Sequence, residues 1–252
     1  MSFTTLLYHE IRESRMHHPG QASPIEVRQA YEDHLPPPLF VTLENFLAQM
    51  EYLYENRFHT LSLQEVKDYY YKGTGLPEKS VLLTFDDCYQ SMGLYAYPAL
   101  KKYGFHAVAF VVTGWLNTQK KSFDPEKSVC LTENELEKMT GIFEYANHTH
   151  QFHTRTGTTV SRMMEAGEEE ISRDLDRCNA SLLLQARDVF AYPFGLYSDQ
   201  NVALLRNKGF KLAFTSEGGR NTGNTDPLLL KRNVIPYSVD METFRNITGK
   251  TG

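Results

Sequence analysis

The feature that most constrains this sequence is a series of short, almost wholly apolar runs. They read SVLLTF (80–85), HAVAFVVT (106–113), IFEYAN (142–147), VFAYPF (189–194) and KLAFTS (211–216), with TTLLYH (4–9) and LLLKRNVIP (228–236) near the two ends. Runs without polar alternation are typical of strands that are buried on both faces. Because helical segments separate these runs, they predict a parallel sheet with helices on its outside.

About seven strands and no clean internal boundary favour one domain over residues 1–252. We expect a distorted (β/α) barrel of about seven parallel strands, similar to a TIM barrel, rather than a doubly wound sheet. Residues 10–40 are polar and Pro-rich, and we expect them to form a long surface loop inserted into this domain.

Capping residues and apolar spacing predict the helices. Thr42 is a predicted N-cap, and capping boxes are predicted for Ser62 with Glu65 and for Thr132 with Glu135. The helix after Thr42 is expected to bury Leu43, Phe46, Leu47, Met50 and Leu53, and a long charged helix is expected to bury Ile171, Leu175, Cys178 and Leu182.

Composition excludes several classes of protein. The net charge is −5 and no long basic run exists, so nucleic acid is not an expected partner. No stretch approaches the roughly 20 apolar residues of a membrane span. Three scattered cysteines are expected to be free thiols. The N-terminus lacks a signal-peptide pattern, so the sequence indicates the cytoplasm, or the cell surface if a leader is missing from it.

Residues with catalytic chemistry stand where the predicted strands end. They are His9, the pair Asp86–Asp87, the cluster from His148 to His153, and the YPFG turn at 192–195. In a parallel α/β barrel, the carboxyl ends of the strands meet at one face, and active sites lie there. We therefore expect these separate segments to converge on one mouth.

The Asp86–Asp87 pair has two interpretations. At a strand end both carboxylates can face one site, where one binds a cation and the other stays free as a base. An ordinary turn followed by a helix N-cap uses the same residue type, and on the pair alone that interpretation is the safer one.

Three histidines, His148, His150 and His153, lie within six residues. Imidazoles and a carboxylate together form a usual zinc ligand set that leaves a position open for water. The spacing does not exclude His150 as a substitute for either neighbour. By itself, His9 is more often a buried hydrogen-bonded residue than a catalyst. The YPFG turn by itself indicates a structural turn, although its N–H groups can also meet an oxyanion.

These segments resemble the polysaccharide deacetylases, the NodB-homology domain of carbohydrate esterase family four. LLTFDDCYQS (82–91) resembles the family's first motif, NHTHQFH (147–153) its second, and FAYPFG (190–195) its third. The similarity runs from Leu6 to about Phe244. The His-Thr-x-x-x-His spacing, the Tyr-Pro-aromatic-Gly turn and the early LxYH strand are most similar to the branch that deacetylates poly-β-1,6-linked N-acetylglucosamine, in which the strand order is circularly permuted.

The resemblance implies a role for each of these residues. Asp87, His148 and His153 would bind the metal, and Asp86 would be the general base that deprotonates water. In the permuted branch the catalytic histidine comes from the first strand, so His9 would be the general acid for the leaving amine. A lightly perturbed His9, with a pKa near 7, would supply that proton.

The third motif and two departures complete the expected site. The backbone N–H of Phe194, in a substrate-binding turn with Tyr192 and Pro193, would help to hold the oxyanion. Where the family has Gly, this chain has Cys88, whose thiol is a potential soft ligand near the metal. The arginine of the third motif, which orients the base, aligns with Ala191, and Arg232 is the candidate replacement. The fourth motif is not recognisable.

The resemblance implies a metal-dependent polysaccharide N-deacetylase. It would release acetate from N-acetylglucosamine residues of a cell-wall or matrix glycan with a divalent metal, Zn first and Co or Ni as alternatives. The expected partner is an N-acetylated glycan, and a monomer is expected. Two alternatives stay open: an amidohydrolase for a small non-sugar amide on the same fold, and a carbohydrate-binding protein with a decayed site.

Overall fold

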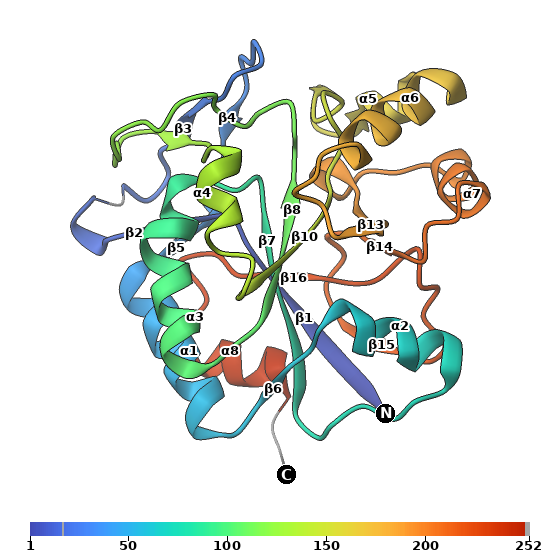
Figure 1. Cartoon of the computed structure of the whole chain (residues 1–252). Coiled ribbons are helices and arrows are strands. Elements are labelled where there is room, and N and C mark those ends of the chain that lie inside the picture. Colours follow the sequence, from blue (N-terminus) through green and yellow to red (C-terminus); the bar gives the residue numbers. More distant parts are fainter. Residues whose placement is uncertain (17, 250–252) are drawn as a thin grey trace.

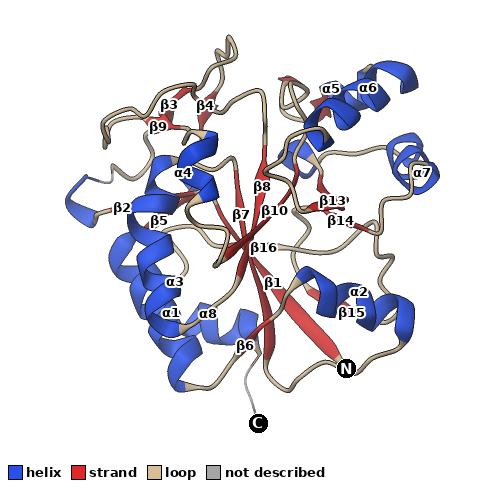
Figure 2. Cartoon of the chain, in the orientation of Figure 1, coloured by secondary structure: helices blue, strands red, loops and turns tan. Residues whose placement is uncertain are grey.

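The structure is a computed structural model that describes residues 1–16 and 18–249. Its core is a curled sheet with helices around it (Figures 1 and 2). Six strands follow one another in the order β14 (Leu212–Phe214), β13 (Ala186–Ala191), β10 (Phe143–Asn147), β8 (Ala107–Val111), β7 (Ser80–Asp86) and β1 (Ser2–Tyr8). Every neighbouring pair in this series is parallel.

The segment 230–234 joins the two sides of this sheet. Leu230 forms a parallel bridge with Phe214 of β14, while β16 (Asn233–Val234) pairs in parallel with β1. The sheet is thereby curled into a distorted barrel with seven parallel strand positions, which confirms the predicted fold class. Two shorter strands extend it: β15 (Arg220–Thr222), which runs antiparallel to β1, and β6 (His59–Thr60), which is parallel to β7.

Helices cover the outside of the barrel, and all three predicted caps are present. The helices are α1 (Leu43–Glu55), α2 (Leu63–Lys72), α3 (Tyr97–Tyr103), α4 (Glu133–Glu137), α5 (Arg162–Glu165), α6 (Glu168–Asn179), α7 (Asp199–Asn207) and α8 (Met241–Thr248). Thr42 caps α1, and both predicted capping boxes form, on α2 and α4. Among the described residues, no helix is long and apolar enough to cross a membrane.

Two residues were wrongly predicted to face the core. Leu47 is 42% exposed, because on α1 it lies about 100° around the helix from Phe46, outside the buried stripe. Leu182 is 87% exposed, because α6 ends at Asn179 and the helical spacing that would relate Leu182 to Cys178 does not continue.

The expected surface loop at residues 10–40 is in part a structured element. Its short strands are β2 (Glu10–Arg12), which pairs with β5 (Phe40–Thr42), and β3 (Ser23–Glu26), which pairs with β4 (His34–Leu35) and β9 (Ser128–Val129). We call residues 23–39 the strap. Its Leu35 packs in a core cluster with Trp115, so the prediction of a loop confined to the surface was wrong here.

The strap lies at one end of the barrel. In Figure 1 its strands β3 and β4 stand at the top, away from the two chain termini at the bottom. Two further short strands, β11 (Arg155–Thr156) and β12 (Val160–Ser161), form a hairpin after β10, and short helical turns occur at Ser14–Met16, Pro37–Leu39, Met92–Ala96 and Pro193–Gly195. The carboxyl ends of β1, β7, β10 and β13 carry the predicted site residues except Arg232, which directly precedes β16.

Candidate active site

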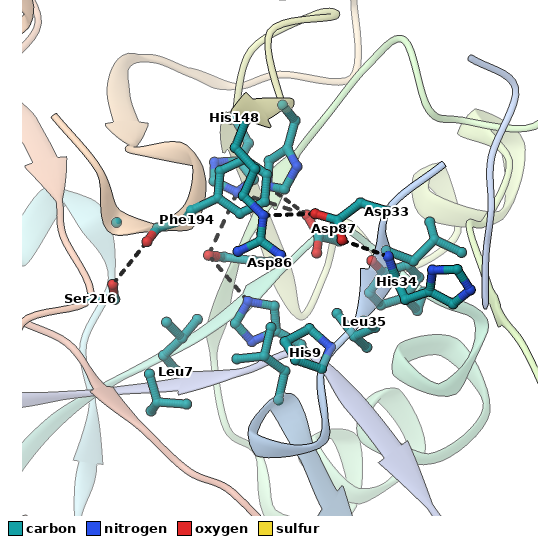
Figure 3. Close-up of a pocket in the computed structure, with 18 of the residues that line it drawn as sticks. Leu7, His9, Asp33, His34, Leu35, Asp86, Asp87, His148, Phe194 and Ser216 are labelled. Atoms are coloured by element: carbon teal, nitrogen blue, oxygen red, sulfur yellow. Dashed lines mark hydrogen bonds and ion pairs between the residues drawn. The ribbon is translucent and has the colours of Figure 1, made fainter. Parts of the chain in front are cut away.

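Asp86 and Asp87 stand where β7 ends and the chain turns (Figure 3). Asp86 is the last residue of β7, and Asp87 and Cys88 follow with positive φ angles of 69° and 57°. This left-handed backbone interrupts the alternation of the strand, so both carboxylates line one cavity. Each aspartate is 3% exposed, and a carboxylate buried to this extent needs a partner to stay ionised.

A buried arginine holds the carboxylate of Asp86. Nη1 and Nη2 of Arg232 donate to its two oxygens at 2.6 and 2.8 Å, and Nε donates to the carbonyl oxygen of Thr215 at 2.7 Å. Burial alone would raise the pKa of Asp86, but the charge of Arg232 and its hydrogen bonds lower it to about 2. Asp86 is therefore ionised at neutral pH, and the structure brings it together with the arginine that the sequence suggested.

Asp87, His148 and His153 form a second group beside this pair. The Nε2 atoms of His148 and His153 lie 3.8 and 3.5 Å from Oδ1 of Asp87. One potential ligand atom from each of the three residues lies within 4.8 Å of the others. Oδ1 of Asp87 is buried and accepts no hydrogen bond from the described residues. Burial and the neighbouring charge of Asp86 raise the pKa of Asp87.

The imidazole rings of His148 and His153 are neutral at pH 7, the form in which they can act as ligands. Burial lowers the pKa of His148, and it lowers the pKa of His153 well below the ordinary value. Nδ1 of His148 lies 2.8 Å from the carbonyl oxygen of Ala191, so the ring donates there and its Nε2 carries the lone pair that faces Asp87. Neutral imidazole is the form that binds a metal, and the group can therefore hold a metal ion.

His150 lies outside this group. Its Nδ1 is 2.8 Å from Oγ1 of Thr113, and its ring lines a separate cavity with Arg177. Asp174 accepts the backbone N–H groups of His150 and Gln151 and so fixes the turn of this segment. The sequence left His150 open as a ligand, and the structure separates it from Asp87.

His9 directly follows β1 and lies against Asp86, with 3.9 Å between its Nε2 and Oδ2 of the acid. Burial, assisted by the charge of Arg232, lowers the pKa of His9 to about 4, although Asp86 acts in the opposite direction. The expected pKa near 7 was wrong because the side chain is only 10% exposed. His9 is neutral at pH 7.

The turn at 192–195 contributes two residues to the cavity wall, Phe194 and Gly195, and two to the core. Phe194 has a positive φ of 59° and lines the cavity, with its ring centroid 4.4 Å from that of His153. Tyr192 is buried and donates its hydroxyl to the carbonyl oxygen of Leu228, and Pro193 is buried as well. The sequence grouped all three with the substrate, but of these only Phe194 lines the cavity.

Cys88 is turned away from the metal group. Its Sγ lies 3.8 Å from the carbonyl oxygen of Phe110, and its side chain packs in the main core cluster. Burial and the charge of Asp87 raise the pKa of the thiol well above its ordinary value, so it stays protonated. The expectation of a soft ligand at this position was therefore wrong.

Sequence reasoning missed the aromatic residues beside His153. The ring centroid of Trp115 lies 4.5 Å from that of His153, and Tyr31 of the strap packs on Trp115 at 4.6 Å. Trp115 is the only tryptophan in the chain and comes shortly after β8, so the strand-end rule that found the histidines would have found it too.

Sequence reasoning also missed an ion pair at the mouth. Nε of Arg155 donates to Oδ2 of Asp33 in the strap at 2.7 Å, and its guanidinium lies 4.8 Å from the ring centroid of Phe194. Arg155 comes two residues after His153, and this proximity was a usable signal. Asp33 has no pattern around it that would have marked it.

One cavity of about 210 Å³, the catalytic cavity, is lined by the two acids, His9, His148, His153, Phe194, Trp115 and both members of the ion pair (Figure 3). The ionisable residues from the barrel are His9, Asp86, Asp87, His148, His153 and Arg232, and the residues from the strap are Ile25, Tyr31, Asp33, His34, Leu35, Pro36 and Leu39. The strap thus forms one wall of the cavity, opposite the charged residues of the barrel.

In a (β/α) barrel, active sites lie at the carboxyl ends of the strands, and here two carboxylates and two imidazoles meet at that end. The family model described as polysaccharide deacetylase matches residues 73–213. A poly-β-1,6-N-acetyl-D-glucosamine N-deacetylase of Staphylococcus aureus is 30% identical over 201 residues, which are 77% of this chain and 67% of the relative. Its namesake of Staphylococcus epidermidis is 26% identical over 200 residues, 77% and 68%. The chain therefore belongs to the polysaccharide deacetylase family, as the motifs predicted.

Solved structures of deacetylases share the fold. Streptococcus pyogenes deacetylase PplD, in complex with acetate, has a TM-score of 0.76 at 22% identity and covers 99% of both chains. IcaB from Ammonifex degensii has a TM-score of 0.68 at 21% identity and covers 97% of both chains. These likenesses confirm the barrel, and the family shows that the chain is an enzyme of the deacetylase type.

Proposed function

We propose that this chain hydrolyses the N-acetyl group of N-acetylglucosamine residues in a cell-wall or matrix polysaccharide and releases acetate. The observation that carries the proposal is the pair of acids after β7, one held by Arg232 and the other beside two imidazoles. The names of the relatives favour poly-β-1,6-linked N-acetylglucosamine as the polymer.

Asp87, His148 and His153 would hold a divalent cation. Two features of Asp87 fit this: its Oδ1 is buried without a hydrogen-bond donor, and its raised pKa is one that an adjacent cation would lower. One carboxylate and two imidazoles suit catalytic zinc, so we propose Zn, with Co or Ni as alternatives. When bound, the cation would polarise the amide carbonyl and acidify a water molecule.

Asp86 is the proposed general base. The two hydrogen bonds from Arg232 fix the plane of its carboxylate and keep it ionised, and its Oδ2 lies 3.7 Å from Nε2 of His148. A base in this place is directed at the metal group and can take a proton from the attacking water. In this role Arg232 replaces the arginine that the family carries at the position of Ala191.

His9 is the proposed proton donor to the leaving amine. Because it is neutral at pH 7, it has to accept a proton before it can donate one. Asp86 lies 3.9 Å away, so a small approach allows the proton taken from water to pass to His9. His9 then protonates the nitrogen as the C–N bond breaks. Water thus supplies the hydroxyl of the acetate and the proton of the amine.

The backbone N–H of Phe194 is the proposed oxyanion donor. The ring of Phe194 is fixed against His153, and the buried side chains of Tyr192 and Pro193 anchor the turn from behind. A donor that is fixed before the reaction stabilises developing charge without reorganisation. Tyr192 and Pro193 would therefore act through the shape of the turn rather than through contact with substrate.

The shape of the cavity favours one alternative, hydrolysis of a small non-sugar amide. The strap closes one side, and the volume of about 210 Å³ is below the roughly 300–1,000 Å³ of pockets for drug-sized ligands. A decayed binding protein lacks comparable support, because the two acids and the three histidines assigned roles above all line the same cavity.

The test is acetate release from N-acetylglucosamine oligomers by the zinc- or cobalt-loaded protein. Asp86→Asn is expected to lower kcat by roughly 10²–10⁴-fold with its metal content unchanged, and His148→Ala is expected to lose metal and activity together. Full activity of metal-loaded Asp86→Asn would refute the base assignment. If only small amides were hydrolysed, the alternative would replace the proposal. The expected monomer stays a prediction, which sedimentation tests.

A further inference from the structure

The ion pair between Asp33 and Arg155 forms part of the lining of two neighbouring cavities, and we call it the shared wall. It joins the strap to β11 at the mouth of the site, and its side chains are 33% and 24% exposed. Asp33, Arg155 and Tyr31 line the catalytic cavity, and the same three residues line a second cavity of about 380 Å³, which we call the outer cavity.

The rest of the outer cavity is lined by two more residues of the strap and by the residues on either side of β11. Its remaining lining residues are Ala30, Glu32, Thr154 and Gly157. A larger surface cavity of about 680 Å³ around His150 and Arg177 has no lining residue in common with the catalytic cavity. The outer cavity therefore borders the catalytic cavity along the three residues that both share.

The chemistry of the shared wall suits a sugar. Nε of Arg155 is used by Asp33, whereas its two terminal nitrogens make no hydrogen bond with any described residue and stay available as donors. Asp33 and Glu32 offer carboxylate acceptors, and Tyr31 is a half-buried ring with an apolar face and a polar tip. Donors, acceptors and a ring in one small depression match a neutral, hydroxyl-rich ligand.

The size of the catalytic cavity gives the reason why such a site is needed. Its volume of about 210 Å³ is below the roughly 300 Å³ or more of pockets for drug-sized ligands, so it leaves room for one sugar unit at most. A polymer whose reacting unit sits there has to continue outside the cavity, and the wall formed by Asp33 and Arg155 is the boundary that it would cross.

We propose that the outer cavity binds the sugar next to the one being deacetylated, and that Arg155, positioned by Asp33, contacts both sugars. The inference rests on the proposed function. It adds that the residues lining the outer cavity determine how strongly the enzyme prefers longer glycan substrates. Binding energy from the neighbouring sugar would hold the reacting unit in place at the metal group.

A chain-length series tests this. Acetate release is measured with N-acetylglucosamine and its oligomers of two to five units, and 4-nitrophenyl acetate serves as a small substrate that needs the catalytic cavity alone. Two variants fill the outer cavity, Ala30→Trp and Glu32→Trp, at exposed positions that do not line the catalytic cavity. Ala203→Trp, at an exposed position on α7, is the matched control.

We expect kcat/KM of the wild type to rise when a second sugar is added. Ala30→Trp and Glu32→Trp should raise KM for the oligomers by roughly tenfold with kcat little changed, the pattern of lost binding outside the reacting centre. Activity on the small ester and metal content should stay as in Ala203→Trp. Unchanged KM for oligomers in both filling variants would overturn the subsite while leaving the proposed function intact. No acetate from any oligomer with the wild type would overturn both.

Discussion

Asp86 and Asp87 are neighbours in sequence, are equally buried, and have opposite electrostatic environments. Asp86 accepts two hydrogen bonds from Arg232, and its pKa falls to about 2. Asp87 faces two neutral imidazoles and the negative charge of Asp86, and its pKa rises. The difference comes from which protein groups surround each acid, since burial by itself raises the pKa of both.

This contrast shows how one strand end prepares two roles. The protein itself supplies a cation for Asp86, the guanidinium of Arg232, so Asp86 stays negatively charged at any pH near neutrality. The protein supplies no such cation for Asp87. In the folded protein without metal, burial and the charge of Asp86 therefore favour the neutral form of Asp87. A divalent cation between Asp87, His148 and His153 would remove that penalty and is therefore expected to bind and to stabilise the fold at the same time.

The largest effect is expected when a potential metal ligand beside Asp87 is removed. His148→Ala should lower kcat/KM by roughly 10³-fold or more, because the several kcal/mol of charge stabilisation that a metal supplies would be lost. The same variant should lose the rise in Tm that zinc gives the wild type. His150→Ala is the matched control, since His150 bonds Thr113 outside the group; a loss of zinc response in that variant would contradict the assignment.

Removing Arg232 from the Asp86 side should lower stability in addition to activity. Arg232→Met leaves a buried carboxylate without its cation and should lower the free energy of unfolding by about 3–5 kcal/mol, as measured by urea titration of the metal-free protein. The double variant Asp86→Asn/Arg232→Met should recover most of this loss, because no charge is then left alone. If the single and double variants were equally unstable, the loss would come from packing instead of charge.

The same ion pair predicts a dependence on pH. The pKa of Asp86 in the folded protein, about 2, is below the ordinary value of 3.8, so its stabilising contribution is present above about pH 4 and is lost as the pH falls toward 2. Arg232→Met should flatten this acid-side loss of stability. A wild-type protein whose stability is constant from pH 4 to pH 2 would contradict the low pKa.

The smallest effect is expected at Cys88, the residue that follows the two acids. Cys88→Gly relieves a positive φ of 57°, worth about 1 kcal/mol, but removes a buried side chain of similar value. Stability should therefore change little, and zinc affinity in a calorimetric titration should stay within about twofold because the thiol is turned to Phe110. A much weaker zinc affinity would show that the thiol is a ligand after all.

The parts of the fold that follow from local patterns could be predicted from the sequence. Apolar runs gave the barrel strands, and the residue types at their ends marked His9, both acids and the histidine cluster. Two kinds of feature could not be derived this way. The pKa of His9 depends on burial by distant segments, and the wall between Asp33 and Arg155 joins residues 122 positions apart.

Three predictions were wrong because the sequence does not show where a helix ends, where very short strands lie, or where the backbone turns. Leu182 has the sequence spacing of the buried residues of α6, but the helix ends before this residue, at Asn179. The strap was taken for a surface loop because its strands are only two to four residues long and have too few apolar residues to show an alternation. Cys88 was near the metal group in sequence, but the left-handed turn at that residue directs its side chain into the core.

The most direct test compares the unfolding free energies of metal-free wild type, Asp86→Asn and Asp87→Asn at pH 7. Asp86→Asn breaks a buried ion pair and should be less stable than the wild type by about 3 kcal/mol. Asp87→Asn should be more stable than the wild type, because an acid whose pKa is raised on folding opposes folding at any pH above its ordinary pKa of 3.8. Zinc should then stabilise the wild type but not Asp87→Asn. Equal losses of stability in both variants would contradict the separation of the two acids into different environments.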